Sequence, residues 1–174
     1  MLLNGVCTYS NLLISQGIVL VNSNHLGSIL LDGGTLGGTG SVASIAATLA
    51  SGSVLSPGAS VGTLTCGNLT LGSSVTSVFE ITPTNCDRLD VNGPVQLSGT
   101  LQLVALGTPS ANLSYTLINN DGVDAIGGSF SGLPSYVPAA TGLVNGFCAL
   151  RTSNLSPTSR TPLSLSVISA SAQA

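Results

Sequence analysis

Apolar residues alternate with polar ones in short runs along the middle of the chain. The alternating apolar pairs are Leu64/Cys66, Leu69/Leu71, Leu89/Val91, Val95/Leu97 and Leu101/Leu103. Because successive side chains of a β-strand point to opposite faces, each pair predicts a short strand with one buried face. The segments between these strands are rich in turn-forming residues, namely 67–68, 72–74, 92–94 and 98–99. The chain is therefore expected to bend after each short strand.

The composition favours strands over helices. Hydrophobic residues make up 43% of the 174 residues and charged residues only 5%, with no lysine. The polar remainder is mainly Ser, Thr, Asn and Gly, which suit strands and turns better than helix surfaces. The segment 42–55 is rich in Ala and Leu, but Gly52, its serines and the missing charged face argue against a helix there. The sequence predicts one all-β body with a continuous core.

The charge pattern excludes two classes of partner. The cationic side chains, apart from one histidine, are Arg88, Arg151 and Arg160, against six acidic residues. These residues cannot form the basic patch that a nucleic acid or an anionic membrane surface needs, so neither is expected as a partner. Glycines, serines and Pro57 interrupt the long uncharged stretches, so no transmembrane helix is predicted. The first residues do not resemble a signal peptide, so we expect a removed signal or a fragment of a longer protein.

Segments 62–71 and 88–97 resemble each other at an offset of about 25 residues. Both contain an apolar-x-apolar step, a turn and a second apolar-x-apolar step. This offset suits one coil of a solenoid, in which each strand pairs with the equivalent strand of the next coil about 4.8 Å away. Parallel coiling is therefore the expected fold. A Greek-key β-sandwich also uses short strands with frequent turns, and it is the alternative.

Four segments match, in order, the steps of a known repeat. They are DGGTLGGTG at 32–40, LSPGASVGTL at 55–64, DRLDVNG at 87–93 and LSGTL at 97–101. The run from Asp32 to Ile81 resembles the autotransporter-associated β-strand repeat of bacterial autotransporter passenger domains. The resemblance implies a right-handed parallel β-helix, that is, a β-solenoid, located extracellularly or on the bacterial cell surface.

The resemblance extends over about residues 9–133 and implies a division of the chain. Residues 9–31 look like a preceding repeat, and Tyr115–Ile118 with Gly127–Leu133 look like the usual closing segment. We expect residues 1–133 to form the β-helix repeats. Residues 134–174, with a last apolar strand at Leu163–Ile168, are expected to form a terminal cap or tail strand packed on the same body. The membrane-embedded barrel that follows such passengers is not expected in this chain.

The resemblance and the scarcity of ionisable residues predict a structural or adhesive scaffold that is not an enzyme. The open ends of a solenoid carry unpaired strand edges, so end-to-end self-association is expected as one kind of partnership. A host or cell-surface glycan or protein is another expected partner. A glycan-binding or glycan-cleaving β-helix protein is the alternative function. Glycan cleavage needs clustered carboxylates, or a basic residue with bound cations. The chain has one glutamate and no lysine, so such a catalytic cluster is disfavoured.

Asp87 and Asp90 are weak candidates for a cation site, because two carboxylates three residues apart can share an ion. Arg88 and solvent are expected to satisfy both carboxylates instead. No metal and no cofactor are therefore predicted.

Ser23 and Ser28 flank His25 in the sequence, and Asp32 follows a few residues later. The residue types of a Ser-His-Asp triad are therefore all present in this segment. No nucleophile-elbow motif accompanies these residues, so we expect a surface histidine in a loop and no catalytic residue.

The four cysteines, Cys7, Cys66, Cys86 and Cys148, are widely spaced and form no C-x-x-C pair. This spacing disfavours a zinc site and a cysteine-protease site. Cys66 lies two residues after Leu64 in an alternating run, so it is expected to be a free thiol in the core. The sequence leaves open the disulfide state of the four cysteines.

Overall fold

The computed structural model describes residues 1–5, 9–48, 52–107, 110, 113–121, 124 and 126–131, with the strands 147–152 and 163–168. These residues form strands and turns and contain no helix. The predicted all-β class is therefore confirmed, and segment 42–55 contributes strands instead of a helix. Within these ranges, no helix is long and apolar enough to cross a membrane.

The first eight strands are β1 (Leu2–Leu3), β2 (Asn11–Ile14), β3 (Ile18–Val21), β4 (Ser28–Leu31), β5 (Thr35–Gly38), β6 (Ser41–Ala47), β7 (Val54–Pro57) and β8 (Thr63–Leu71). The others are β9 (Thr76–Ile81), β10 (Arg88–Val91), β11 (Val95–Leu97), β12 (Thr100–Ala105), β13 (Ser114–Asn120), β14 (Ile126–Gly128), β15 (Phe147–Thr152) and β16 (Leu163–Ile168).

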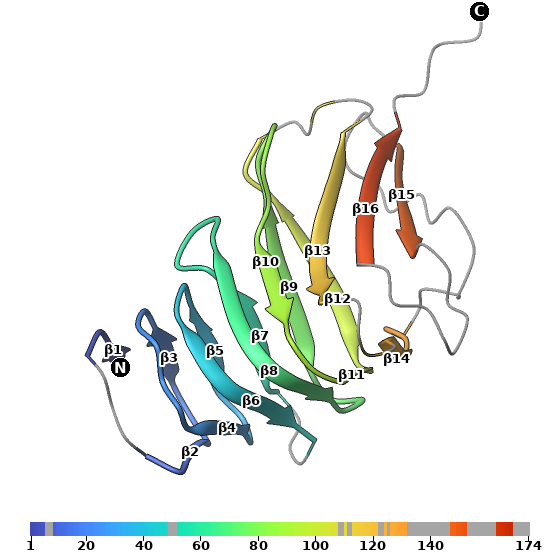
Figure 1. Ribbon diagram of the computed structural model, residues 1–174. Coiled ribbons are helices and arrows are strands. Elements are labelled where there is room, and N and C mark those ends of the chain that lie inside the picture. The colour runs from blue at the N-terminus through green and yellow to red at the C-terminus, as the bar shows by residue number, and fades with distance from the viewer. Residues whose placement is uncertain are drawn as a thin grey trace, which may run out of the picture.

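The strands form two sheets, and the early strands alternate between them. Sheet A has the order β1-β3-β5-β7-β9-β12, and sheet B runs from β2 through β4, β6, β8, β10 and β13 to β16 and β15. Figure 1 shows the strands side by side, following one another from β1 at the N-terminal end to β16. All pairings among β1–β14 are parallel. A Greek-key sandwich is built from antiparallel strands, so this pairing argues against the alternative fold.

The core consists of columns of apolar side chains that stack from strand to strand. In sheet B, successive partners in one column are Leu12, Ile29, Ile45, Leu69, Val95 and Ile126. In sheet A, the corresponding column is Val19, Leu36, Leu55 and Leu101, with the buried polar Ser77 between Leu55 and Leu101. Most of these side chains are buried, and burial of apolar area at about 25 cal/mol per Å² is the main favourable term for the fold.

Most of the predicted inward-facing pairs are confirmed. Leu64, Cys66, Leu89 and Val91 are buried, and Leu64 lies opposite Leu89 in parallel register, as the repeat offset predicted. The pair Leu101/Leu103 is only partly buried and packs against the edge of the core. These residues lie on β12, which is the last strand of sheet A.

The turn predicted at residues 67–68 is wrong, because β8 continues through it and keeps parallel register with β6. The strand bends there instead: Cys66 and Leu69 are buried, while the two residues between them are not. The pairing with β6 skips Gly67 and resumes in the same register at Asn68, so no separate turn is needed. Gly67 permits the bend because a Cβ at this position would overlap the carbonyl oxygen of Ala43 on the neighbouring strand.

The predicted apolar strand at the C-terminal end is present as β16. It pairs with β13 in antiparallel orientation, and β15 pairs antiparallel with β16. Because β16 is antiparallel to both β13 and β15, β15 runs in the same direction as β13. β15 lies at the edge of sheet B.

Candidate functional site

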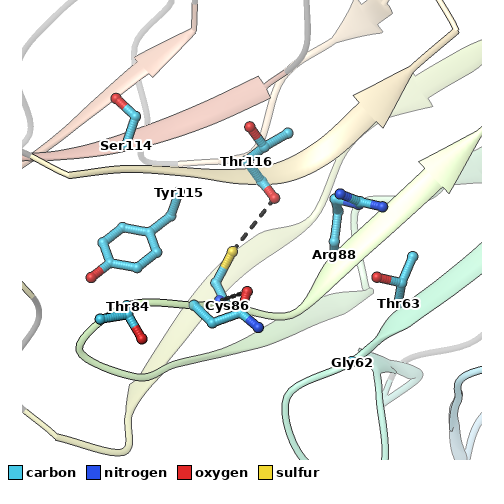
Figure 2. Close-up of a pocket in the computed structure, with 9 residues that line it drawn as sticks. Gly62, Thr63, Thr84, Cys86, Arg88, Ser114, Tyr115 and Thr116 are labelled. Carbon is cyan, nitrogen blue, oxygen red and sulfur yellow. Dashed lines mark hydrogen bonds between the residues drawn. The ribbon is translucent and has the colours of Figure 1, made fainter.

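A pocket of about 240 Å³ lies at the start of β8, β10 and β13. The loop before β10 supplies Thr84, Asn85 and Cys86, and Arg88 follows on the strand itself. The other walls are Gly62 and Thr63 beside β8, and Ser114, Tyr115 and Thr116 on β13. Figure 2 shows these residues on the three strands β8, β10 and β13 and on the loop before β10. The lining is dominated by hydroxyl groups, with one amide and one guanidinium.

Hydrogen bonds hold the loop wall of the pocket in one conformation. The Thr82 amide and hydroxyl donate to the Asn85 carbonyl oxygen at 2.8 and 3.0 Å, and the Asn85 amide donates to the Thr82 hydroxyl at 3.0 Å. The buried Tyr115 hydroxyl donates to the Pro83 carbonyl oxygen at 2.8 Å and accepts from the Ser110 amide at 3.2 Å. The wall is therefore preorganised, since both ends of the loop are tied to neighbouring backbone.

Cys86 lies in this pocket wall as a free thiol, and its Sγ donates to the Thr116 carbonyl oxygen at 3.5 Å. Burial, together with the nearby Asp87 carboxylate, raises the pKa of the Cys86 thiol to about 11, although Arg88 acts in the opposite direction. The thiolate is the nucleophilic form of cysteine, so this thiol is a weak nucleophile at neutral pH, where it is mainly protonated.

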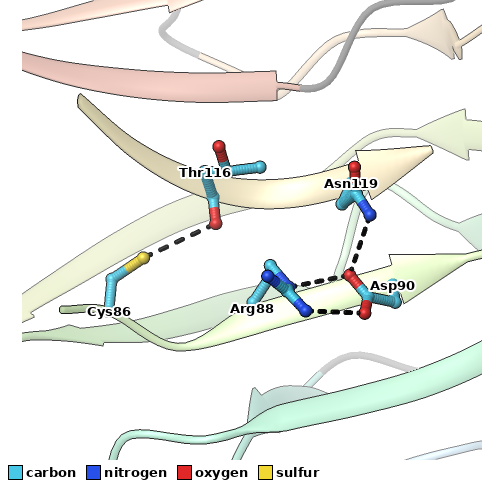
Figure 3. Close-up of polar contacts among 5 residues, drawn as sticks. All are labelled: Cys86, Arg88, Asp90, Thr116 and Asn119. Carbon is cyan, nitrogen blue, oxygen red and sulfur yellow. Dashed lines mark hydrogen bonds and ion pairs between the residues drawn. The ribbon is translucent and has the colours of Figure 1, made fainter.

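Arg88 and Asp90 form an ion pair on the outer face of β10 (Figure 3). The Arg88 Nε lies 2.8 Å from Asp90 Oδ1, and its Nη2 donates to Oδ2 at 2.9 Å. Asn119 of β13 donates its Nδ2 to Asp90 Oδ1 at 3.2 Å. This side-on arrangement leaves the remaining N–H donors of Arg88 available at the pocket, because a guanidinium carries five donors.

Asp87 points the opposite way and is completely buried. Its Oδ1 accepts from the Gly62 amide at 2.9 Å, and its Oδ2 accepts from the Glu80 amide at 2.7 Å. Burial raises the pKa of the Asp87 carboxyl to about 6, although the two amide donors act in the opposite direction. Asp87 therefore joins the strands β8, β9 and β10 through their backbones.

The two weak candidates for a cation site are thus not brought together. Asp87 faces inward and binds backbone amides, while Asp90 faces outward and binds Arg88 and Asn119. In the part of the chain that the structure describes, no cluster of three or more His, Cys, Asp or Glu side chains could hold a metal ion.

The expectation of a surface histidine is wrong, because His25 is only 2% exposed. Its Nε2 lies 2.9 Å from the Ser23 hydroxyl, and its ring stacks on Tyr9 with centroids 5.6 Å apart. The Ser23 hydroxyl is also within 2.9 Å of the Gly5 carbonyl oxygen. The His25 Nδ1 is buried and has no hydrogen-bond partner among the described residues, so Asp32 does not complete a catalytic triad. Tertiary packing of Tyr9 over the loop buries this ring.

The prediction for Cys66 is confirmed: its thiol is free and buried, and burial raises its pKa to about 12. Cys7 and the side chain of Cys148 lie outside the described residues, so their disulfide state stays open.

The chain matches no protein family, and no curated protein sequence is significantly similar to it. The autotransporter resemblance therefore stays a prediction from the motifs. The pocket itself was not predicted, because its walls come from segments near residues 62, 85 and 115 that only the fold brings together.

Proposed function

We propose that this chain forms successive rungs of a right-handed parallel β-helix and serves as a non-catalytic scaffold outside the bacterial cell or on its surface. The observation that carries the proposal is the parallel pairing, in both sheets, of strands that lie two apart in the chain from β1 to β10, and three apart for β9–β12 and β10–β13. A chain that returns to the same sheet after each second strand suits a coil whose rungs stack. The ordered motifs between residues 32 and 101 support an exported, autotransporter-like protein.

A scaffold role suits the chemistry of the described side chains. The Asp87 carboxylate accepts two backbone amides, the Cys86 thiol is protonated at neutral pH, and His25 has no carboxylate partner. General acid–base or nucleophilic catalysis needs such groups to be poised and accessible to a substrate. Stacked apolar columns, in contrast, give a rigid body that extends by adding rungs.

The outer strands of the two sheets suit end-to-end association of copies. Sheet A has β1 and β12 at its edges, and sheet B has β2 and β15. The parallel pairings give β1 and β12 the same direction, and the two reversals at β16 give β15 the direction of β2. Near the N-terminal edge, Leu2, Leu13 and Ile18 are 55%, 57% and 59% exposed. Unpaired edges with apolar side chains are templates for further strand pairing.

The test is the size of the purified protein as a function of concentration, measured by light scattering and analytical ultracentrifugation. We expect mass to grow with concentration, and Leu13→Lys to suppress this growth because an edge lysine opposes strand pairing. Thr70→Lys, an exposed position in the middle of sheet B, is the matched control and is expected to associate normally. A monomer at all concentrations would remove end-to-end association from the proposal.

A separate experiment tests whether the protein is non-catalytic, as proposed, or is a glycan-cleaving β-helix protein. We expect no release of reducing ends or unsaturated sugars from a panel of polysaccharides. Reproducible release that Asp90→Asn abolishes would replace the scaffold with an enzyme. Asp90 is the appropriate residue for this test because its carboxylate is on the surface, whereas Asp87 is buried.

A further inference from the structure

We propose that the pocket beside Cys86 is a binding site for a single neutral sugar ring, at the end of a glycan or within one. Sugar binding at this pocket would be a function in addition to the scaffold role. Its volume of about 240 Å³ is below the range of about 300–1,000 Å³ typical of pockets for drug-sized ligands. A ligand of one ring fits this size, and a longer glycan would continue into solvent.

The lining matches the hydrogen-bonding character of a sugar. Hydroxyl side chains both donate and accept, as sugar hydroxyls do, and Thr63 and Thr84 supply two of them. Asn85 uses its Oδ1 to accept from the Cys86 amide at 2.9 Å, which leaves its NH₂ group as a donor. The donors of Arg88 that Asp90 does not engage add a further group that can bind a ring or hydroxyl oxygen.

The charges around the pocket favour a neutral ligand over an anion. Arg88 is the one cationic side chain in the lining, and Asp90 neutralises it through two contacts. Asp87 lies between Cys86 and Arg88 in the chain, and its carboxylate is close enough to raise the pKa of the Cys86 thiol in the pocket wall. A uronate, sulfate or phosphate would therefore meet no net positive charge, and repulsion would offset its contact with Arg88.

The walls are already ordered before a ligand arrives. The Tyr115 hydroxyl and the Thr82–Asn85 hydrogen bonds fix the loop, and the Cys86 Sγ bonds to the backbone of β13 (Figure 2). Binding therefore costs little conformational entropy at the site, which matters for a weak ligand such as one sugar ring.

The experiment is a two-dimensional NMR titration of the full chain with methyl glycosides of glucose, galactose and mannose at millimolar concentrations. We expect saturable shifts of the amides at 62–63, 84–88 and 114–116 with at least one sugar. Methyl glucuronate and inorganic phosphate are the anionic probes, and each is expected to bind more weakly. Thr84→Trp places a large side chain at an exposed loop position in the pocket wall and is expected to weaken binding at least about tenfold.

Thr70→Val is the control, because Thr70 is exposed on β8 away from the pocket, and it is expected to leave the affinity unchanged. The dispersed spectrum of each variant reports that it is folded. The proposal is overturned by the absence of saturable shifts with all three sugars, by shifts that map elsewhere, or by unchanged affinity in folded Thr84→Trp. Tighter binding of glucuronate or phosphate than of every neutral sugar would also overturn it and would assign the pocket to anions.

Discussion

Asp87 shows how much one side chain can organise in a chain with few charges. Its two oxygens accept hydrogen bonds from the amide of Gly62, just before β8, and from the amide of Glu80 on β9. The carboxylate is completely buried, so both amides depend on it for an acceptor. Buried backbone groups without a partner cost free energy, which makes Asp87 a structural residue.

Replacing Asp87 with Ala is expected to lower the free energy of unfolding by about 2 kcal/mol at neutral pH, because two amides lose their acceptor. Relief of the buried charge offsets part of that loss. The matched control is Asp90→Ala, which breaks a partly exposed ion pair and is expected to cost about 1 kcal/mol or less. Urea unfolding of both variants measures the difference, and equal losses would contradict the role assigned to Asp87.

The stability of the protein is also expected to depend on the protonation of Asp87. Its pKa is raised from 3.8 to about 6, so the folded state binds a proton more tightly than the unfolded state. The resulting stabilisation is fully present below pH 3.8 and is lost as the pH rises through about 6. The upper limit is about 3 kcal/mol, since one pKa unit corresponds to about 1.4 kcal/mol.

Urea unfolding at several pH values between about 4 and 7 tests this linkage in the wild type and in Asp87→Asn. The wild type is expected to gain stability on acidification relative to the variant, because the other carboxyl groups are common to both. Two parallel pH profiles would show that Asp87 titrates alike in the folded and unfolded states.

At the scale of the element, the strands depend on close approach between neighbouring backbones. Gly38 at the end of β5 has a φ of 109°, in the region that favours glycine, and its amide and carbonyl pair with Gly58. A Cβ at Gly38 would overlap the nitrogen and carbonyl oxygen of Val21 on β3. The glycine-rich segment 33–40 is therefore a packing requirement of these strands as well as a sequence motif.

Gly38→Ala is expected to lower the free energy of unfolding by at least about 2 kcal/mol, since both the backbone conformation and the contact with Val21 become unfavourable. Gly5→Ala is the control, because a Cβ there meets no atom within 4 Å. Thermal unfolding of the two variants gives the comparison. A Gly38→Ala protein as stable as Gly5→Ala would mean that β3 and β5 can separate at no cost.

Over the whole molecule, stability is expected to be greatest in the middle of the strand stack. The strand β8 pairs along both edges, with β6 on one side and with β10 and β11 on the other. In the described residues, β1 pairs only with β3 and β12 only with β9. A stack in which each layer contacts only its neighbours frays from its ends.

Native-state hydrogen exchange tests this gradient directly. Amides of β8 are expected to exchange slowest, and those of β1 and β12 faster, at a protein concentration low enough to prevent association. Uniform protection from β1 to β12 would indicate a single cooperative unit instead of a stack with weak ends.

The sequence by itself determined the local features of this protein. Alternation located the strands around Leu64, Leu69, Leu89 and Val95 and their buried faces, because side-chain direction in a strand depends only on parity. The same rule predicted the buried thiol of Cys66. The repeat offset also predicted that Leu64 and Leu89 are neighbours, since equivalent positions of a repeat stack on each other.

Only the tertiary structure decided which distant groups meet. It buried His25 beneath Tyr9, separated Asp87 from Asp90, and turned the expected corner at residues 67–68 into a bend within β8. The pocket beside Cys86 is of the same kind, since its walls come from segments near residues 62, 85 and 115 that lie far apart in the sequence. Contacts of this sort depend on which segments lie next to one another in the fold, and alternation within one strand does not identify the partner of that strand.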